Sequence, residues 1–309
     1  MVDHTTLPFR DDVVALFPGQ GSISAAAGTA WRSSTHWDIV TKVSEVAGVD
    51  VEALLLDAHG DDVVRTDRAQ LATFALSLVG YNELLDLGVR PRYLLGHSLG
   101  EFSALVASGL LELDEGTRLI AVRGAAMARA ADLTEGSMVA VMGGDEGARN
   151  ALDTLDDVWI ANINGTGQIV VSGTRSGLDN LMATHRELGW RRATPLPVGG
   201  AFHSPLMAPA QDELDVALEN TAWGSTQATL ISNVDAKVHS SPDEWRDLLR
   251  RQLTSPVEFL DATLALPESV QITVEMPPGG VLTGLTKRIR SFDVQLAPAT
   301  LVELQESAP

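Results

Sequence analysis

The stretch Tyr93-Leu94-Leu95-Gly96-His97-Ser98-Leu99-Gly100-Glu101-Phe102-Ser103-Ala104 joins an apolar run to a helical pattern through Gly-His-Ser-Leu-Gly. This is the Gly-x-Ser-x-Gly pattern of a nucleophile elbow, where a strand turns sharply into a helix and the flanking positions, Gly96 and Gly100, tolerate little beyond hydrogen. Backbone N–H groups and the helix dipole at such a helix start favour developing negative charge. The pattern predicts Ser98 as a catalytic nucleophile, with a structural Gly/Ser turn as the alternative.

Bulk composition excludes several classes of protein. The chain has 309 residues, 45% of them hydrophobic and 20% charged, as in a globular protein with a substantial core. It has no cysteine, so disulfides and thiolate metal sites are excluded, and we expect no metal. The formal net charge of −19 argues against a nucleic-acid partner, because phosphate binding needs a basic surface. We found no membrane-spanning apolar run and no signal-peptide pattern, so we expect a cytoplasmic protein with no membrane partner.

A second glycine-rich turn follows the apolar strand expected at Asp12–Phe17. The turn Pro18-Gly19-Gln20-Gly21-Ser22 would put backbone N–H groups and the Gln20 side chain at the carboxyl edge of a sheet, where open α/β folds bind ligands. It lacks the Gly-Lys-Ser/Thr of a phosphate loop. A glycine turn without a ligand is the alternative.

Arg123 lies in the apolar and small-residue segment Leu119–Met127. A charge among such neighbours is costly to bury without a partner. Spacing alone leaves two readings open: Arg123 pairs with an internal carboxylate, or it awaits an anionic ligand.

Residues 137–198 follow a pattern of their own. Their spacing predicts the order βαββαβ of a ferredoxin-like unit, which can be inserted in a larger domain because its first and last strands are adjacent. We therefore expect an α/β fold with two subdomains. Residues 1–130 and 199–309 would form a large hydrolase-like subdomain with a parallel sheet and the nucleophile elbow, and residues 131–198 a small ferredoxin-like one.

His203 differs from the other histidines in its setting. It combines a glycine-flanked entry, small neighbours and the expected start of a helix that continues through Ala210–Leu218. This setting is typical of a positioned general base, and a capping or core histidine is the alternative. Leu230–Asp235 predicts a strand with a polar end, and Val281–Ile289 a final helix.

Six motifs, in order along the chain, resemble those of the malonyl-CoA:acyl-carrier-protein transacylases and the related acyltransferase domains of polyketide synthases. The matching segments are Phe17–Ser22, Gly96–Glu101, Arg123–Gly124, Gly200–Met207, Ser232–Asp235 and Val281–Arg288. They span nearly the whole chain, so together they are far more specific than any single motif.

The resemblance implies a role for each matching residue. Ser98 would take an acyl group from a coenzyme A thioester, and His203 would remove its proton and later protonate the leaving thiol. A backbone carbonyl, here that of Gln252, would orient the imidazole in place of an acid, giving a Ser–His dyad. Backbone N–H groups of Gln20 and Leu99 would form the oxyanion hole.

The resemblance also implies the substrates. Arg123 would bind the free carboxylate of malonyl or methylmalonyl in a two-pronged ion pair. That carboxylate would leave little room for water, so the acyl-enzyme would wait for a thiol. The partners would be malonyl-CoA and a phosphopantetheinylated acyl carrier protein. We expect no permanently bound cofactor, the coenzyme A thioester being a substrate, and a monomer.

Acyl choice is expected to depend on Gly200, Ala201 and Phe202. Ala201-Phe202-His203-Ser204 resembles the malonyl-selecting pattern, whereas methylmalonyl enzymes tend to carry Tyr-Ala-Ser-His. Phe202 would fill the space of an α-methyl group, a discrimination of only about 1–3 kcal/mol. Gly199 and Gly200 would act the other way and widen the pocket.

Two features need separate explanation. Pro277 replaces a residue of the usual Glu-x-Gly-Pro-Gly turn, which we expect to alter a loop near the edge of the site. An acidic chain must also dock an acidic carrier protein. We expect a basic patch at the mouth of the cleft, with solvated surface charge as the alternative, from the pairs Arg191/Arg192, Arg250/Arg251 and Lys287/Arg288.

Other functions are less consistent with the residues. A serine acyl hydrolase should lack Arg123, and an α/β-hydrolase triad would need an acid between Ser98 and His203. An idle interaction subunit should have lost Ser98, His203 or Gln20. A trans-acting polyketide acyltransferase for an unusual acyl or carrier-bound substrate stays open, as does the choice between fatty-acid and polyketide synthesis.

Overall fold

The computed structural model describes residues 6–57 and 65–309, and within them the strands form a six-stranded and a four-stranded sheet. In the larger sheet the strand order is β10-β9-β1-β2-β7-β8, parallel throughout except for the antiparallel pair of β7 and β8. Its strands are β1 (Phe9–Phe17), β2 (Arg90–Gly96), β7 (Thr229–Ile231), β8 (Val238–His239), β9 (Ile272–Glu275) and β10 (Val294–Leu296).

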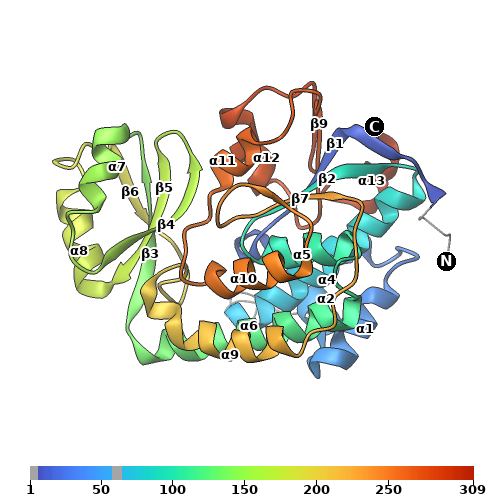
Figure 1. Cartoon of the computed structure of the whole chain (residues 1–309), viewed down its shortest axis with the longest axis horizontal. Helices are drawn as coiled ribbons and strands as arrows, with labels where there is room; N and C mark the ends of the chain where they lie inside the picture. Colours follow the sequence, from blue (N-terminus) through green and yellow to red (C-terminus); the bar gives the residue numbers. More distant parts are fainter. Residues whose placement is uncertain (1–5, 58–64) are drawn as a thin grey trace.

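Helices enclose this sheet, as Figure 1 shows. They are α1 (Asp38–Ala47), α2 (Val51–Leu56), α4 (Thr66–Asp86), α5 (Leu99–Ala107), α6 (Leu113–Leu133), α9 (Ala208–Glu219), α10 (Pro242–Gln252), α11 (Phe259–Leu264), α12 (Val281–Ile289) and α13 (Leu301–Ser307). Short 3₁₀ helices are η2 (Gln20–Ser22), η3 (Thr29–Trp31) and η4 (Pro205–Met207). None of the described helices is both long and apolar enough to cross a bilayer.

The central strand β1 explains why the sheet needs cover on both faces. Val13, Ala15 and Phe17 enter the core shared with α4, α5 and α6. Val14 and Leu16 point the other way, into a second core with α11 and α12. A strand with two buried faces reads as a continuous apolar run, as this one does in the sequence.

The four-stranded sheet has the order β4-β5-β3-β6 with antiparallel neighbours. Its elements are β3 (Gly136–Met142), α7 (Glu146–Leu152), β4 (Val158–Gly165), β5 (Gln168–Thr174), α8 (Arg175–Thr184) and β6 (Arg192–Pro195). Its first and last strands, β3 and β6, pair with each other. The chain therefore enters and leaves this unit at adjacent strands.

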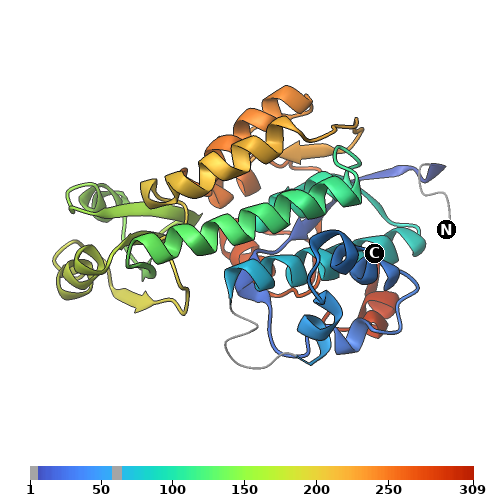
Figure 2. The same ribbon diagram turned by 90° about the horizontal axis from the view of Figure 1, so that it is seen from below.

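Two connections hold the small sheet against the rest of the molecule. The long helices α6 and α9, which precede and follow the unit in the chain, run side by side in Figure 2 and contact each other. Val257 also joins β4 by two backbone hydrogen bonds, to Ala161 and Ile163. The small sheet is thus fixed beside the carboxyl ends of the parallel strands.

Some local expectations were wrong. The strand expected over Leu230–Asp235 ends at Ile231, because the next residues turn back and the N–H of Ala236 donates to the carbonyl of Ser232. Pro277 is buried against α4, where a β-carbon on Gly80 would lie 2.2 Å from the proline ring. It therefore shapes helix packing and not the edge of the site.

Candidate active site

The turn between β2 and α5 places Ser98 in a strained conformation. Its φ of 54° and ψ of −107° lie where side chains are rarely found, at the N-cap of α5. A β-carbon on Gly96 would lie 2.1 Å from the Glu101 backbone nitrogen, and one on Gly100 would lie 1.9 Å from the Phe17 carbonyl oxygen. Both glycines are therefore required by close backbone contact.

Asn233 braces this turn from the loop after β7. Its Oδ1 accepts from the Ser98 backbone N–H at 2.6 Å, and its Nδ2 donates to the Gly96 carbonyl at 2.8 Å. A side chain that bonds on both sides of a strained residue stabilises its conformation. Sequence reasoning noted the Ser232–Asp235 motif but gave Asn233 no role.

His203 lies within hydrogen-bond distance of the Ser98 hydroxyl, with 2.7 Å between Oγ and Nε2. Its Nδ1 is 3.0 Å from the backbone carbonyl of Gln252. A carbonyl only accepts, so Nδ1 carries the proton and donates, which leaves Nε2 as the acceptor for the serine hydroxyl. Burial, and then the charge of Arg123, lower the pKa of His203 to about 3.

The expectation that His203 opens a helix was wrong. The residue has a φ of 56°, outside helical geometry, and precedes η4, after which α9 begins at Ala208. Ser204 caps η4, its hydroxyl accepting from the Leu206 N–H. The imidazole is thus held on a tight turn between β6 and the helix.

Arg123, on α6, is 1% exposed and points at the nucleophile. Its Nη2 donates to Ser98 Oγ and to Gln252 Oε1, each at 3.0 Å, and its Nη1 donates to Gln70 Oε1 at 2.7 Å. Within the described residues it forms no ion pair, and its buried Nε has no hydrogen-bond partner. Burial lowers its pKa to about 9. Of the two readings left open by the sequence, the geometry favours a cation that awaits an anionic ligand.

A buried carboxylate lies behind the serine. Glu101 is 1% exposed, and its two oxygens accept from the Asn233 N–H at 2.7 Å and from the Gln252 Nε2 at 2.5 Å. Burial raises its pKa to about 7, while these donors and the charge of Arg123 act in the opposite direction. From the sequence, Glu101 was recognised only as part of the elbow motif. The feature that could have revealed its role is a charged residue among apolar neighbours at the start of a helix.

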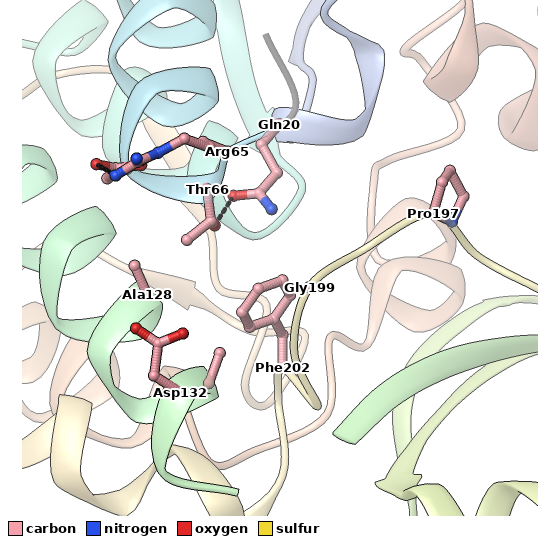
Figure 3. A pocket seen from close by; sticks show the side chains of 10 residues that line it. Gln20, Arg65, Thr66, Ala128, Asp132, Pro197, Gly199 and Phe202 are labelled. Carbon is pink, nitrogen blue, oxygen red and sulfur yellow. Dashed lines mark hydrogen bonds and ion pairs between the residues drawn. The ribbon is translucent and has the colours of Figure 1, made fainter. Parts of the chain in front are cut away.

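The Gln20 loop lies against the elbow. A β-carbon on Gly19 would lie 3.2 Å from the His97 carbonyl oxygen, and Gln20 begins η2 directly after it. Figure 3 shows the Gln20 side chain accepting from the Thr66 hydroxyl, at 2.6 Å. Leu99, the first residue of α5, is buried beside Ser98. Both residues thus have their backbones next to the nucleophile.

A cleft of about 500 Å³ opens between the two sheets, beside the Gln20 loop. His97 lines it and donates from Nε2 to Asn164 Oδ1 at 2.9 Å, while burial lowers the pKa of this histidine. On the far side of His203 a second hollow of about 690 Å³ is lined by α7 and β4 residues. His203 lines this second hollow, and His97, the residue before Ser98, lines the cleft, so the dyad lies between the two subdomains.

Phe202 borders a further pocket of about 400 Å³, drawn in Figure 3. A β-carbon on Gly200 would lie 2.9 Å from the Phe202 ring and 2.8 Å from Ala131. The missing side chain of Gly200 therefore leaves space that the Phe202 ring fills. Gly200 does not enlarge the pocket, contrary to the expectation from sequence. Gly199 lines the pocket with open space around it. Ala201 is buried against Gly136.

The cations of the expected basic patch differ in their ion pairing. Arg250 pairs with Asp215 and Glu219, and Arg251 pairs with Asp247, so this pair is neutralised where it lies and that part of the expectation was wrong. The other two pairs form no ion pair within the described residues. We call their four side chains the basic mouth: Arg191, Arg192, Lys287 and Arg288.

The basic mouth lies at the cleft. Arg288 donates to the side chain of Gln168, which lines the cleft of about 500 Å³. The Arg191 side chain lies against Gly143, whose N–H donates to the carbonyl of Gly167 in the turn next to Gln168. Cations at the start of β6 and in the last turn of α12 therefore flank the same opening.

Comparison with known proteins places these features in a family. A family model described as an acyl transferase domain matches residues 14–305. The chain is 33% identical over 285 residues to the malonyl CoA-acyl carrier protein transacylase of Bacillus subtilis strain 168, and the match covers 90% of each chain.

Solved structures agree. MCAT from Mycobacterium tuberculosis matches with a TM-score of 0.89 at 34% identity, covering 96% of this chain and 99% of that one. A type II PKS acyl-carrier protein in complex with its malonyl-transacylase matches with a TM-score of 0.89 at 32% identity, with the same coverage. The similarity extends over the whole architecture and not over the elbow alone.

Proposed function

Because the chain belongs to the family of malonyl-CoA:acyl-carrier-protein transacylases, we propose that it moves a malonyl group from coenzyme A to the phosphopantetheine thiol of an acyl carrier protein. One observation carries the malonyl part of this proposal. Arg123 is a buried cation whose hydrogen-bond acceptors are all neutral, and one of them is the hydroxyl of Ser98. An acyl group that ends in a carboxylate would bring the missing anion to this cation.

Ser98 acts as the nucleophile and His203 as the base. Nε2 takes the hydroxyl proton while Oγ attacks the thioester carbonyl, and the same proton leaves on the coenzyme A sulfur as the acyl-enzyme forms. In the second half the carrier thiol gives its proton to Nε2 and its sulfur attacks the ester. The proton then returns to Ser98. The Gln252 carbonyl holds the imidazole in the required tautomer throughout.

The tetrahedral intermediates need donors for their oxyanion. We assign these to the backbone N–H groups of Gln20 and Leu99, because Leu99 begins α5 directly after Ser98 and the Gln20 loop packs against the elbow at His97. The N–H of Ser98 itself is already engaged by Asn233. Loss of one such donor typically raises the barrier by about 2.7–4 kcal/mol.

Arg123 binds the malonyl carboxylate through its guanidinium fork. The ion pair offsets the desolvation that depresses the pKa of Arg123. The bound carboxylate also occupies space next to the ester, which favours attack by a carrier thiol over attack by water. A serine acyl hydrolase would have no use for this buried cation.

Phe202 favours malonyl over branched acyl groups. Its ring is 5% exposed and borders the pocket in Figure 3, with Gly200 and Ala201 shaped around it. A discrimination at the scale of one methyl group is worth about 1–3 kcal/mol.

We also propose a type for each subdomain of the α/β fold. We infer that the parallel sheet with its elbow is hydrolase-like, residues 1–130 and 199–309, although residues 1–5 and 58–64 lie outside the described part. The βαββαβ order with adjacent end strands supports a ferredoxin-like unit over residues 131–198. We also propose a cytoplasmic location, no permanently bound cofactor and a monomer. The carrier docks at the basic mouth.

The decisive experiment is intact-protein mass after brief incubation with malonyl-, methylmalonyl- and acetyl-CoA. A malonyl-sized adduct is expected on the native chain. It should be absent from Ser98→Ala and weakened in Arg123→Ala, while acetyl transfer should be less affected by the Arg123 change. No adduct from any donor, in a folded protein, would overturn the proposal.

A further inference from the structure

The side-chain amide of Gln252 is held at both ends behind the elbow. Its oxygen accepts from Arg123, and its Nε2 donates to the Ser98 carbonyl at 3.1 Å and to a Glu101 oxygen at 2.5 Å. If the amide turned over, its oxygen would face two acceptors and its NH₂ would face the Arg123 donors. The orientation of this amide therefore decides whether Arg123 has an acceptor.

Glu101 is the charged member of this arrangement. It lies on α5, and its contacts are to Asn233 and to Gln252, the last residue of α10. It touches neither Ser98 Oγ nor the imidazole, and within the described residues it forms no direct ion pair. Burying a carboxylate without a paired cation costs free energy. A fold that keeps such a carboxylate therefore uses its two oxygens as hydrogen-bond acceptors.

We propose that Glu101 is a positioning residue for acyl recognition. Its carboxylate fixes the Gln252 amide with the oxygen toward Arg123, and the amide in turn holds the guanidinium beside Ser98. This inference rests on the proposed function, in which Arg123 binds the malonyl carboxylate. Glu101 thus acts on substrate choice through two intermediate side chains, without contacting the substrate.

The isosteric change Glu101→Gln separates charge from shape. A glutamine has one oxygen and one NH₂, so it cannot accept from both Asn233 and Gln252. The Asn233 donor is a backbone N–H that cannot rotate, whereas the Gln252 amide can flip. The conflict is therefore relieved at Gln252, which turns its NH₂ toward Arg123 and removes the acceptor.

The experiment measures the rate of Ser98 acylation by malonyl-CoA and by acetyl-CoA, followed by intact mass, with thermal melting as the folding check. Glu101→Gln should lower the malonyl rate constant about tenfold to a hundredfold relative to the acetyl one, the loss typical of a charged hydrogen bond. Glu275→Gln is the matched control. Glu275 is also fully buried and accepts one backbone N–H on each oxygen, from Leu282 and Thr283. It should leave the malonyl-to-acetyl ratio unchanged.

A double-mutant cycle tests the route through Gln252. Gln252→Met keeps the backbone carbonyl that receives the His203 proton donor but removes the amide. It should cause the same malonyl-selective loss, and the double variant should be no worse than either single one. Additive losses, or equal losses for both acyl groups, would overturn the inference. If Glu101→Gln does not fold, an acyl-independent loss in Gln252→Met alone would do so.

The two proposals fail in different ways. If the native chain takes no malonyl group, or if Arg123→Ala leaves its acyl preference unchanged, the proposed function is wrong. If both behave as expected and Glu101→Gln keeps the native malonyl-to-acetyl ratio, only the role of Glu101 is wrong.

Discussion

At the scale of single residues, the site is built on two groups, His203 and Arg123, whose pKa values burial has lowered. His203 is held neutral, with its proton on Nδ1 by the Gln252 carbonyl, so Nε2 is always ready to accept. Arg123 keeps a positive charge close to it, which further opposes protonation of the imidazole. A malonyl carboxylate on Arg123 would neutralise that charge. Substrate binding would therefore make His203 a stronger base at the moment it is needed.

The shifted pKa of His203 predicts a pH dependence of stability. The native pKa of about 3 lies below the value of about 6.5 in the unfolded chain, so between these values the unfolded state binds a proton that the native state does not. The free energy of unfolding therefore falls as pH falls through this window, and the full contribution is present above about pH 6.5.

The measurement is urea unfolding of the native chain and of His203→Gln at several pH values from 7.5 to about 4.5. The difference in free energy of unfolding between the two proteins should fall by up to about 1.4 kcal/mol per pH unit in the acid range. Glu101, with its pKa raised to about 7, contributes in the opposite direction but is present in both proteins. A difference that stays constant across this range would contradict a depressed pKa at His203.

At the scale of elements, the elbow depends on the absence of two β-carbons. The start of α5 packs onto the end of β1 so closely that Gly100 meets the Phe17 carbonyl. Gly100→Ala should therefore destabilise the fold by more than about 3 kcal/mol, as overpacking against immobile backbone does. Its matched control is Gly284→Ala on α12. Gly284 is exposed with open space around it, so that change should stabilise by roughly 0.5–1 kcal/mol.

Urea midpoints of both glycine variants test this contrast. If Gly100→Ala unfolded at the native midpoint, the elbow would not be packed as described. If Gly284→Ala lost stability, helix propensity would not be the deciding factor at that position.

The same elements show what the sequence could and could not predict. The α/β class, the family and the transfer activity were predicted correctly, because they rest on a buried strand, an elbow and ordered motifs. The short elements β8, β10, α11 and α13 were not predicted, since segments of two to seven residues carry little periodicity. Glu101, Asn233 and Gln70 were not assigned roles, because their contacts depend on side chains far apart in the chain.

At the scale of the whole molecule, the inserted sheet makes one wall of the cleft and carries the chain back to His203. The nucleophile comes from the parallel sheet, and the base follows the last strand of the small sheet. The net charge of −19 would repel an acidic carrier over most of the surface. A local excess of positive charge at the cleft would orient such a partner, and the basic mouth provides one from the start of β6 and the last turn of α12.

The last prediction follows from this charge distribution. Neutralising Arg191 and Arg192, or Lys287 and Arg288, to glutamine should raise the KM for the carrier about twofold to tenfold per pair. Neutralising Arg250 and Arg251 removes the same number of charges but from arginines already paired with carboxylates, so it should change this KM little. Malonylation of Ser98 from coenzyme A, measured separately, shows whether a change is specific to the carrier. The difference between the pairs should shrink at about 0.5 M salt, because exposed charges are then screened. If the Arg250/Arg251 variant raised the KM as much as the others did, the carrier would be attracted by overall charge and not by the basic mouth.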